Sequence, residues 1–145
     1  MSENLLVNLH NMADILLQIF YGILLVLNVP FFRIILWLIL HGSVQKFRHN
    51  FVDRLKWKIG QRPGMLNRFD GFPSGQGMTT GSFLYVLYFD VDIPKWKKIA
   101  LTGFVLGFLS IRWFTGRHTL IQLLGGLVVG FIQQVFCKFV FRTAV

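Results

Sequence analysis

Three short polar stretches in this chain of 145 residues have side-chain types that suit the binding of a phosphoryl group. These stretches are Gln61-Arg62-Pro63, Phe72-Pro73-Ser74-Gly75-Gln76 and the segment from Arg112 to His118. Each of their arginines can present a planar fork of N–H donors that matches phosphate oxygens. The serine hydroxyl and the following glycine N–H stand before an apolar segment, where a helix N-terminus adds donors and a favourable dipole. The predicted phosphate-binding residues are Arg62, Ser74, Gly75 and Arg112.

His118 is the candidate nucleophile, because a neutral imidazole is competent to attack phosphorus. Gln122 follows four residues later, which puts it one helical turn further along the same face. Its side-chain oxygen can accept the Nδ1–H of His118. This contact would fix the tautomer in which Nε2 is free to attack.

The composition predicts the surroundings of these residues. Hydrophobic residues make up 54% of the chain and charged residues 14%, with a net charge of +9, and the mean hydropathy is +0.57. A soluble domain has about a quarter of its residues charged, and a disordered chain has low hydrophobicity. We therefore predict a single all-α domain over residues 1–145, a polytopic membrane helical bundle.

Long charge-free runs indicate about four transmembrane helices. Their expected bounds are about 15–40, 76–90, 97–114 and 118–138. The first is expected to be one tilted helix broken near Pro30, because each half alone is too short for about 30 Å of hydrocarbon. Four crossings put the three polar stretches on one side of the membrane. A channel or transporter is less favoured, because no charged residue lies in the middle of a span.

Residues 44–59 carry an apolar stripe at helical spacing, with basic residues mostly on the other faces. This pattern predicts a basic amphipathic helix in the headgroup layer. Similar charges would suit a nucleic acid, but the adjacent spans make anionic membrane lipids the nearer partner. We expect no nucleic-acid partner.

Two glycine pairs, Gly103 with Gly107 and Gly126 with Gly130, have the spacing that lets membrane helices approach closely. They can serve packing within the bundle or a homo-oligomer.

The three polar stretches resemble the three signature blocks of the type-2 phosphatidic acid phosphatase superfamily, in the same order and with comparable spacing. The matching residues are Arg62-Pro63, Pro73-Ser74-Gly75, and Arg112 with His118 six positions later. The resemblance covers about residues 35–135. It implies a membrane-embedded helical bundle that removes phosphate from lipid phosphates without a metal or other cofactor. It also implies a phosphohistidine on His118, with the phosphate-binding residues named above holding the phosphoryl group.

Within this superfamily, His118-Thr119 followed by Gln122 and Gly125-Gly126 is similar to the dolichyl-diphosphatase branch. That branch has glutamine where aspartate is usual elsewhere. The resemblance thus points to a polyprenyl or dolichyl diphosphate as substrate. A membrane of the endoplasmic-reticulum type and a viral membrane both fit.

Two departures from the family pattern affect phosphate binding. The lysine expected seven positions before Arg62 is Leu55, so Lys56 or Lys58 would have to serve, and Lys56 joins the predicted phosphate-binding residues. The serine expected before the arginine of the third block is Ile111.

The third departure concerns the general acid. The histidine expected after Ser74-Gly75 is Gln76, and an amide cannot protonate a leaving group near neutral pH. His49 and Asp70 are the nearest titratable substitutes. An alkoxide leaving from a monoester needs a proton, because its conjugate acid has a pKa near that of water, about 15.7. A lipid phosphate leaving from a diphosphate has a second pKa of about 6 and can depart largely unprotonated.

General acid catalysis contributes roughly 10²–10⁴-fold, so its loss favours a diphosphatase over a monoesterase. The predicted catalytic positions are therefore His118, Gln122 and Gln76. The rival interpretation is a catalytically inactive membrane protein of the same fold, with a structural or lipid-binding role.

Overall fold

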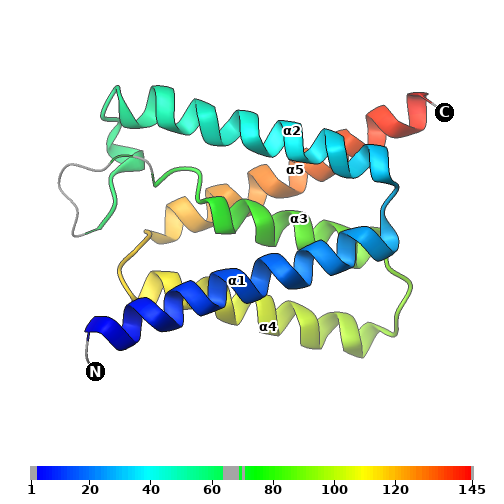
Figure 1. The fold of residues 1–145 in the computed structure, drawn as a ribbon, viewed down its shortest axis with the longest axis horizontal. Helices are drawn as coiled ribbons and strands as arrows, with labels where there is room; N and C mark the ends of the chain where they lie inside the picture. The colour runs from blue at the N-terminus through cyan, green and yellow to red at the C-terminus, as the bar shows by residue number, and fades with distance from the viewer. Residues whose placement is uncertain (1–2, 64–68, 70, 145) are drawn as a thin grey trace.

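The computed structural model describes residues 3–63, 69 and 71–144. Every regular element in this part of the chain is helical, which confirms the all-α prediction. The five α-helices are α1 (Glu3–Asn28), α2 (Phe31–Phe47), α3 (Gly75–Phe89), α4 (Lys95–Phe114) and α5 (Leu120–Ala144) (Figure 1). A short π-helix over Arg48–Asp53 and a 3-10 turn over Lys58–Gly60 follow α2.

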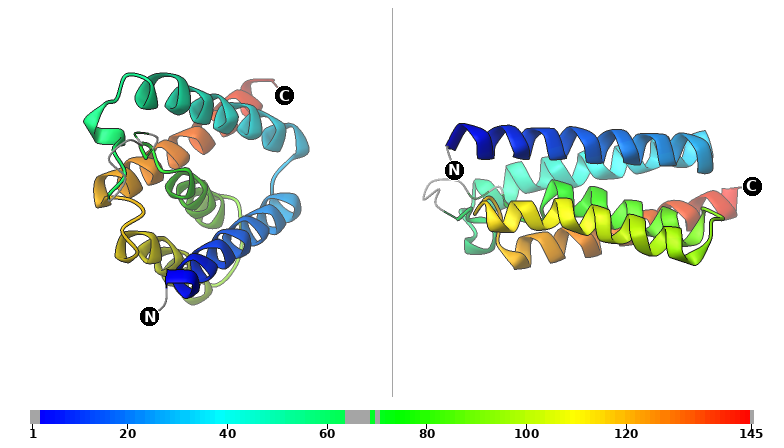
Figure 2. Two further views of the ribbon diagram at one scale, coloured as in Figure 1. Left: turned by 60° about the vertical axis from the view of Figure 1, so that its left-hand side comes forward. Right: turned by 90° about the horizontal axis from the view of Figure 1, so that it is seen from below.

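The helices run back and forth, and α3 lies in the middle of the other four (Figure 2). One end of the bundle holds the connection from α2 to α3 and the turn between α4 and α5, and we call it the His118 end. The opposite end holds the α1–α2 and α3–α4 connections, and we call it the Asp90 end. Figure 1 shows that the chain starts at the His118 end and finishes at the Asp90 end.

The predicted single helix over residues 15–40 is wrong, because α1 and α2 are separate helices that run in opposite directions (Figure 1). Pro30 sits at the N-cap of α2 with an extended ψ of 141°, and the residue before a proline is disfavoured in helical conformation. The helix before the break is also longer than expected. It begins at Glu3 in the polar N-terminal segment, and its 26 residues span about 39 Å.

The separate interfacial helix predicted for residues 44–59 is also wrong. Its first residues form the last turn of α2, and the π-helix Arg48–Asp53 continues the same helical path. The path ends only at Lys56, whose φ of 51° is left-handed. Phe47 and Phe51 stack on each other and are about half exposed, so much of the predicted apolar stripe faces outward from the bundle.

The other three predicted spans coincide with α3, α4 and α5 to within a few residues, except that α5 continues to Ala144. By length and hydropathy, one helix in the described part of the chain qualifies as a membrane span, Leu120–Arg142. Ile15–Asn28 forms a shorter apolar stretch. The predicted four-span arrangement is therefore not confirmed by these criteria.

Glycines bring α3 and α5 into backbone contact. A Cβ added to Gly126 would lie 2.8 Å from the Cα of Gly77, and one added to Gly130 would collide with the backbone of Met78. The Gly126–Gly130 pair thus packs helices within the chain. A Cβ added to Gly103 or Gly107 would meet nothing within 4 Å, so only this pair remains open for the predicted homo-oligomer.

A buried polar network joins the helices at the Asp90 end, and we call it the Asp90 cluster. Arg33 donates to Asp90 at 2.7 Å and to the Gln134 side chain at 3.0 Å. Lys138 donates to the second oxygen of Asp90, also at 2.7 Å. Gln134 in turn donates to the Tyr21 hydroxyl at 2.8 Å. The cluster connects α1, α2 and α5 to the end of α3.

Candidate functional site

His118 lies in the turn between α4 and α5, before the first residue of the α5 helix, and its residue surface is 2% exposed. Burial lowers the pKa of its imidazole, and the positive charges of Arg62, Arg112 and Arg48 lower it further, to about 4. At neutral pH the imidazole is therefore uncharged, which is the form that can act as a nucleophile.

Gln122 orients His118 as the sequence predicts. Its Nε2 donates to the carbonyl oxygens of Ile59 and Gln61, at 3.0 and 2.8 Å. Its Oε1 accepts the Thr119 N–H at 3.1 Å and lies 3.3 Å from His118 Nδ1. Since Oε1 only accepts, Nδ1 must carry the proton, and the Nε2 lone pair remains available. The predicted contact is confirmed.

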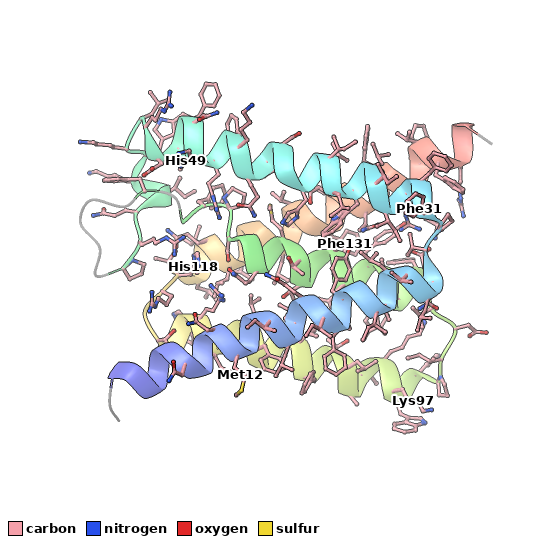
Figure 3. All side chains as sticks on the ribbon, in the orientation of Figure 1. Met12, Phe31, His49, Lys97, His118 and Phe131 are labelled. Carbon is pink, nitrogen blue, oxygen red and sulfur yellow. The ribbon has the colours of Figure 1, made fainter. Side chains whose placement is uncertain are left out.

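The same glutamine gathers the three polar stretches. The Ser74 N–H donates to the Gln122 carbonyl at 3.1 Å, while the Gln122 side chain holds Gln61 as described above. Ser74 is fully buried at the N-cap of α3, where its hydroxyl accepts the Gly77 N–H at 3.3 Å. These contacts confirm the expected convergence of the stretches at one end of the molecule, and Figure 3 shows His118 at that end.

Arg112 helps to build the turn that carries His118. The Arg112 carbonyl accepts the backbone N–H groups of Arg117 and His118, at 3.0 and 3.3 Å. Gly116 adopts a φ of 65°, a left-handed conformation that favours glycine. The Arg112 side chain is buried at the end of α4 and supplies one of the charges acting on His118.

Arg48 and Gln45 belong to this region but were not predicted. A Cβ added to Gly75 would lie 2.8 Å from Gln45 Nε2 and 3.7 Å from Arg48 Nη1. Arg48 Nη1 also donates to the Pro73 carbonyl at 3.4 Å. The available signal was the spacing of His41, Gln45 and Arg48, which puts three polar side chains on one helical face. A separate interfacial helix was predicted for residues 44–59, so His41 was not placed on the same helical face as Gln45 and Arg48.

The other predicted residues that the structure describes are Lys56, Gln76 and His49, and none of them lies on the α4–α5 turn that carries His118. Lys56 is exposed and is not among the charges that act on His118. Gln76 is half-buried in the first turn of α3. The side chain of His49 is 71% exposed, with its Nδ1 3.8 Å from Asp53, and Figure 3 shows it on a different segment from His118. Asp70 lies outside the described residues.

A neutral imidazole with a free Nε2, a capped helix N-terminus and three guanidinium groups can carry out phosphoryl transfer to histidine. Within the described ranges, no group of three or more His, Cys, Asp or Glu side chains is placed to hold a metal ion. Comparisons of the chain with protein-family models, with curated proteins and with solved structures find no match.

Proposed function

We propose that this protein is a multi-pass membrane phosphatase that hydrolyses a polyprenyl or dolichyl diphosphate through a phosphohistidine on His118. The observation that carries the proposal is the hydrogen bond between His118 and Gln122, which leaves Nε2 unprotonated beside guanidinium charge. Burial and the nearby positive charges keep the imidazole neutral, which is its nucleophilic form.

The reaction has two steps. The Nε2 lone pair of His118 forms a bond to the terminal phosphorus, and the bridging P–O bond breaks with its electron pair leaving on the lipid phosphate. A water molecule then attacks the phosphohistidine, the P–N electron pair returns to Nε2, and the water proton passes to solvent. Arg62 and Arg112 bind the phosphoryl oxygens, together with the Ser74 hydroxyl and the Gly75 N–H. Gln76 supplies no proton, and a departing lipid phosphate needs none.

The distribution of side chains supports a bundle that faces lipid. Large apolar side chains point outward from the outer helices, including Val26 at 75%, Phe32 at 76% and Phe139 at 65% exposure. Polar side chains such as Gln122 and Gln134 are instead fully buried. Extensive apolar exposure is unusual for a water-soluble monomer, whereas buried polar and exposed apolar groups suit a membrane.

The surface at the His118 end supports a position at the headgroups. Phe51 and Trp57 are about half exposed there, and Lys46, Arg54 and Lys58 are exposed nearby. Aromatic and basic side chains of this kind anchor proteins at the membrane interface and attract anionic lipid.

A cavity of about 340 Å³ supports a substrate with a long apolar chain. It lies between α1 and α2, where Leu25 and Trp37 line it, and it reaches Thr79 on α3. The Thr79 hydroxyl donates to the Gly75 carbonyl at 3.2 Å, so one lining residue of the cavity lies one helical turn from Gly75. An isoprenoid chain can occupy it while the diphosphate stays at the His118 end.

Covalent labelling tests the proposal. Purified protein in detergent is exposed briefly to a polyprenyl diphosphate radiolabelled in its terminal phosphate, and acid-labile, alkali-stable label on the protein is measured. We expect label on the wild-type protein and on the His49→Ala control, whose exposed side chain lies at the same end, but none on His118→Ala. Label on both His118→Ala and wild type, or on neither, would refute the phosphohistidine.

The amide at Gln76 favours one second candidate, a non-catalytic protein that binds lipid phosphates. For that protein we expect wild-type binding of a lipid diphosphate without label or phosphate release. Turnover that depends on His118 would exclude it.

A further inference from the structure

Arg48 reaches the start of α3 from a helix that the three polar stretches do not include. Its Nη1 lies 3.4 Å from the Pro73 carbonyl and 3.7 Å from the position of a Cβ on Gly75. The next residue along the chain is Gln76, which occupies the position of the missing acid. The guanidinium of Arg48 thus lies close to the place where leaving-group chemistry is expected.

The three guanidiniums do not act on His118 equally. Arg62 and Arg112 lower its pKa more than Arg48 does, so the Arg48 charge has the weakest effect on the nucleophile. A group that attacks one phosphate of a diphosphate has the second phosphate further away, beyond the breaking bond. Arg62 and Arg112 therefore suit the transferred phosphoryl group, and Arg48 suits the phosphate behind it.

We infer that Arg48 binds the lipid-bearing phosphate of a diphosphate substrate and stabilises its charge as it leaves, so that the site selects diphosphates over monophosphates. This inference rests on the proposed function. The bridging P–O bond breaks, and its electron pair stays on the oxygen that becomes part of the lipid phosphate. Arg48 donates charge-assisted hydrogen bonds to that phosphate, and no proton is transferred. Positive charge at this position replaces the proton that a general acid would give.

Charge supports the assignment to a diphosphate. A diphosphate ester carries about three negative charges near neutral pH, and three guanidinium groups act on the region of His118. A phosphate monoester has no second phosphate to occupy the Arg48 position. The same chemistry would also accept free pyrophosphate, so the substrate test includes it.

Equilibrium binding tests the inference without requiring turnover. Methylenediphosphonate and inorganic phosphate are titrated separately into the full chain in detergent, for wild type, Arg48→Gln and Arg54→Gln. We expect Arg48→Gln to weaken the affinity for methylenediphosphonate by about 10- to 100-fold, which is the contribution of hydrogen bonds to charged groups. The affinity for inorganic phosphate should stay nearly unchanged. Arg54 is exposed on the same segment, and its variant should change neither affinity. Equal weakening of both ligands, or of neither, would overturn the inference.

Kinetics test the leaving-group role. We compare kcat/KM for farnesyl diphosphate, pyrophosphate and p-nitrophenyl phosphate, whose nitrophenolate departs without a second phosphate. Arg48→Gln should lower kcat/KM for both diphosphates by about 100-fold and spare p-nitrophenyl phosphate, while Arg48→Lys restores much of the loss. Similar losses on all three substrates would show that Arg48 has no leaving-group role. If farnesyl diphosphate alone is affected, the lipid and not the diphosphate is recognised, and the inference fails.

The two proposals fail in distinguishable ways. If the wild-type protein shows no His118-dependent hydrolysis, the phosphatase proposal fails, and the ratio of the two affinities still decides whether Arg48 selects a diphosphate. If hydrolysis depends on His118 but Arg48→Gln affects all substrates alike, only the inference fails. The charge-conserving Arg48→Lys variant separates loss of charge from loss of folding.

Discussion

The two ends of the bundle use buried arginine differently. At the Asp90 end, Arg33 and Lys138 share one carboxylate, each at 2.7 Å, and the Gln134 amide extends the network to Tyr21. At the His118 end, three guanidinium charges act on a neutral imidazole whose Nε2 is left without a proton.

In the Asp90 cluster, two cations of the chain pair with one carboxylate. Burial alone would raise the pKa of Asp90, but hydrogen bonds from Arg33 and Lys138 outweigh it and hold that pKa below its usual range. The carboxylate is thus stabilised by the protein itself. The buried imidazole at the other end has its charged form disfavoured and its nucleophilic form retained. The proposed function therefore assigns a structural role to the first region and an anion-binding, reactive role to the second.

The sharpest test of this difference is Arg112→Gln. We expect it to reduce kcat/KM for a lipid diphosphate by about 1,000-fold, because the guanidinium stabilises charge that develops in the transition state. Affinity for vanadate should fall in parallel, with little loss of thermal stability. If the variant unfolds at a much lower temperature but retains its affinity for vanadate, Arg112 has a structural role like that of Arg33.

The opposite result is expected for Arg33→Gln. Removing one partner of a buried ion pair costs about 3–5 kcal/mol, so the unfolding temperature in detergent should fall clearly. Vanadate affinity, measured on the protein that remains folded, should not change. Asp92→Asn is the matched control, since Asp92 is exposed two residues from Asp90. Equal effects of the two variants would show that the Asp90 cluster contributes little to stability.

The pH ranges in which His118 and Asp90 change the stability of the fold should differ. The pKa of His118 is lowered to about 4 in the folded protein, while an unfolded histidine titrates near 6.5. Between these values the unfolded state binds more protons, so this group reduces stability as pH falls from about 6.5 to 4. At Asp90 the lowered pKa gives stability that is present above the ordinary carboxylate range and is lost as pH falls through the folded value.

The kinetic consequence is an acid limit set by His118. We expect kcat/KM, which reports the free enzyme, to be insensitive to protonation of His118 from about pH 7 to 5 and to fall only as its pKa of about 4 is approached. The measurement is a pH profile with a substrate whose own ionisation is corrected for. A loss of activity centred near pH 6.5 would mean that His118 is not shielded by burial and positive charge.

Local spacing predicted much of the site and little of what lies between distant helices. The contact of His118 with Gln122 follows from four residues of helical separation, and the helical segments α3 to α5 follow from apolar runs. The Asp90 cluster joins residues separated by 57 and 101 positions, which no local pattern encodes. The reversal at Pro30 was missed because α1 extends into polar residues whose helical character hydropathy does not reveal.

The assignment of a third cation shows the same limit. Seven positions before Arg62 stands Leu55, so the neighbouring Lys56 was predicted in its place, within an expected helix over residues 44–59. The chain instead turns at Lys56 with a φ of 51°, and this leaves Arg48, one helical segment earlier, beside Gly75. Helical spacing is reliable only as far as the helix continues, and the end of a helix is the least certain part of a sequence-based prediction.

Lys56→Ala should accordingly have the smallest effect of the variants considered. Its side chain is exposed, it is not among the charges that act on His118, and salt screens the interactions of exposed charges. We expect less than about a twofold change in kcat/KM, in contrast to Arg48→Gln. Both variants remove one positive charge from the His118 end, so a nonspecific effect of net charge would affect them equally. If Lys56→Ala matched Arg48→Gln on diphosphates, the basic surface as a whole, and not one positioned guanidinium, would account for anion recognition.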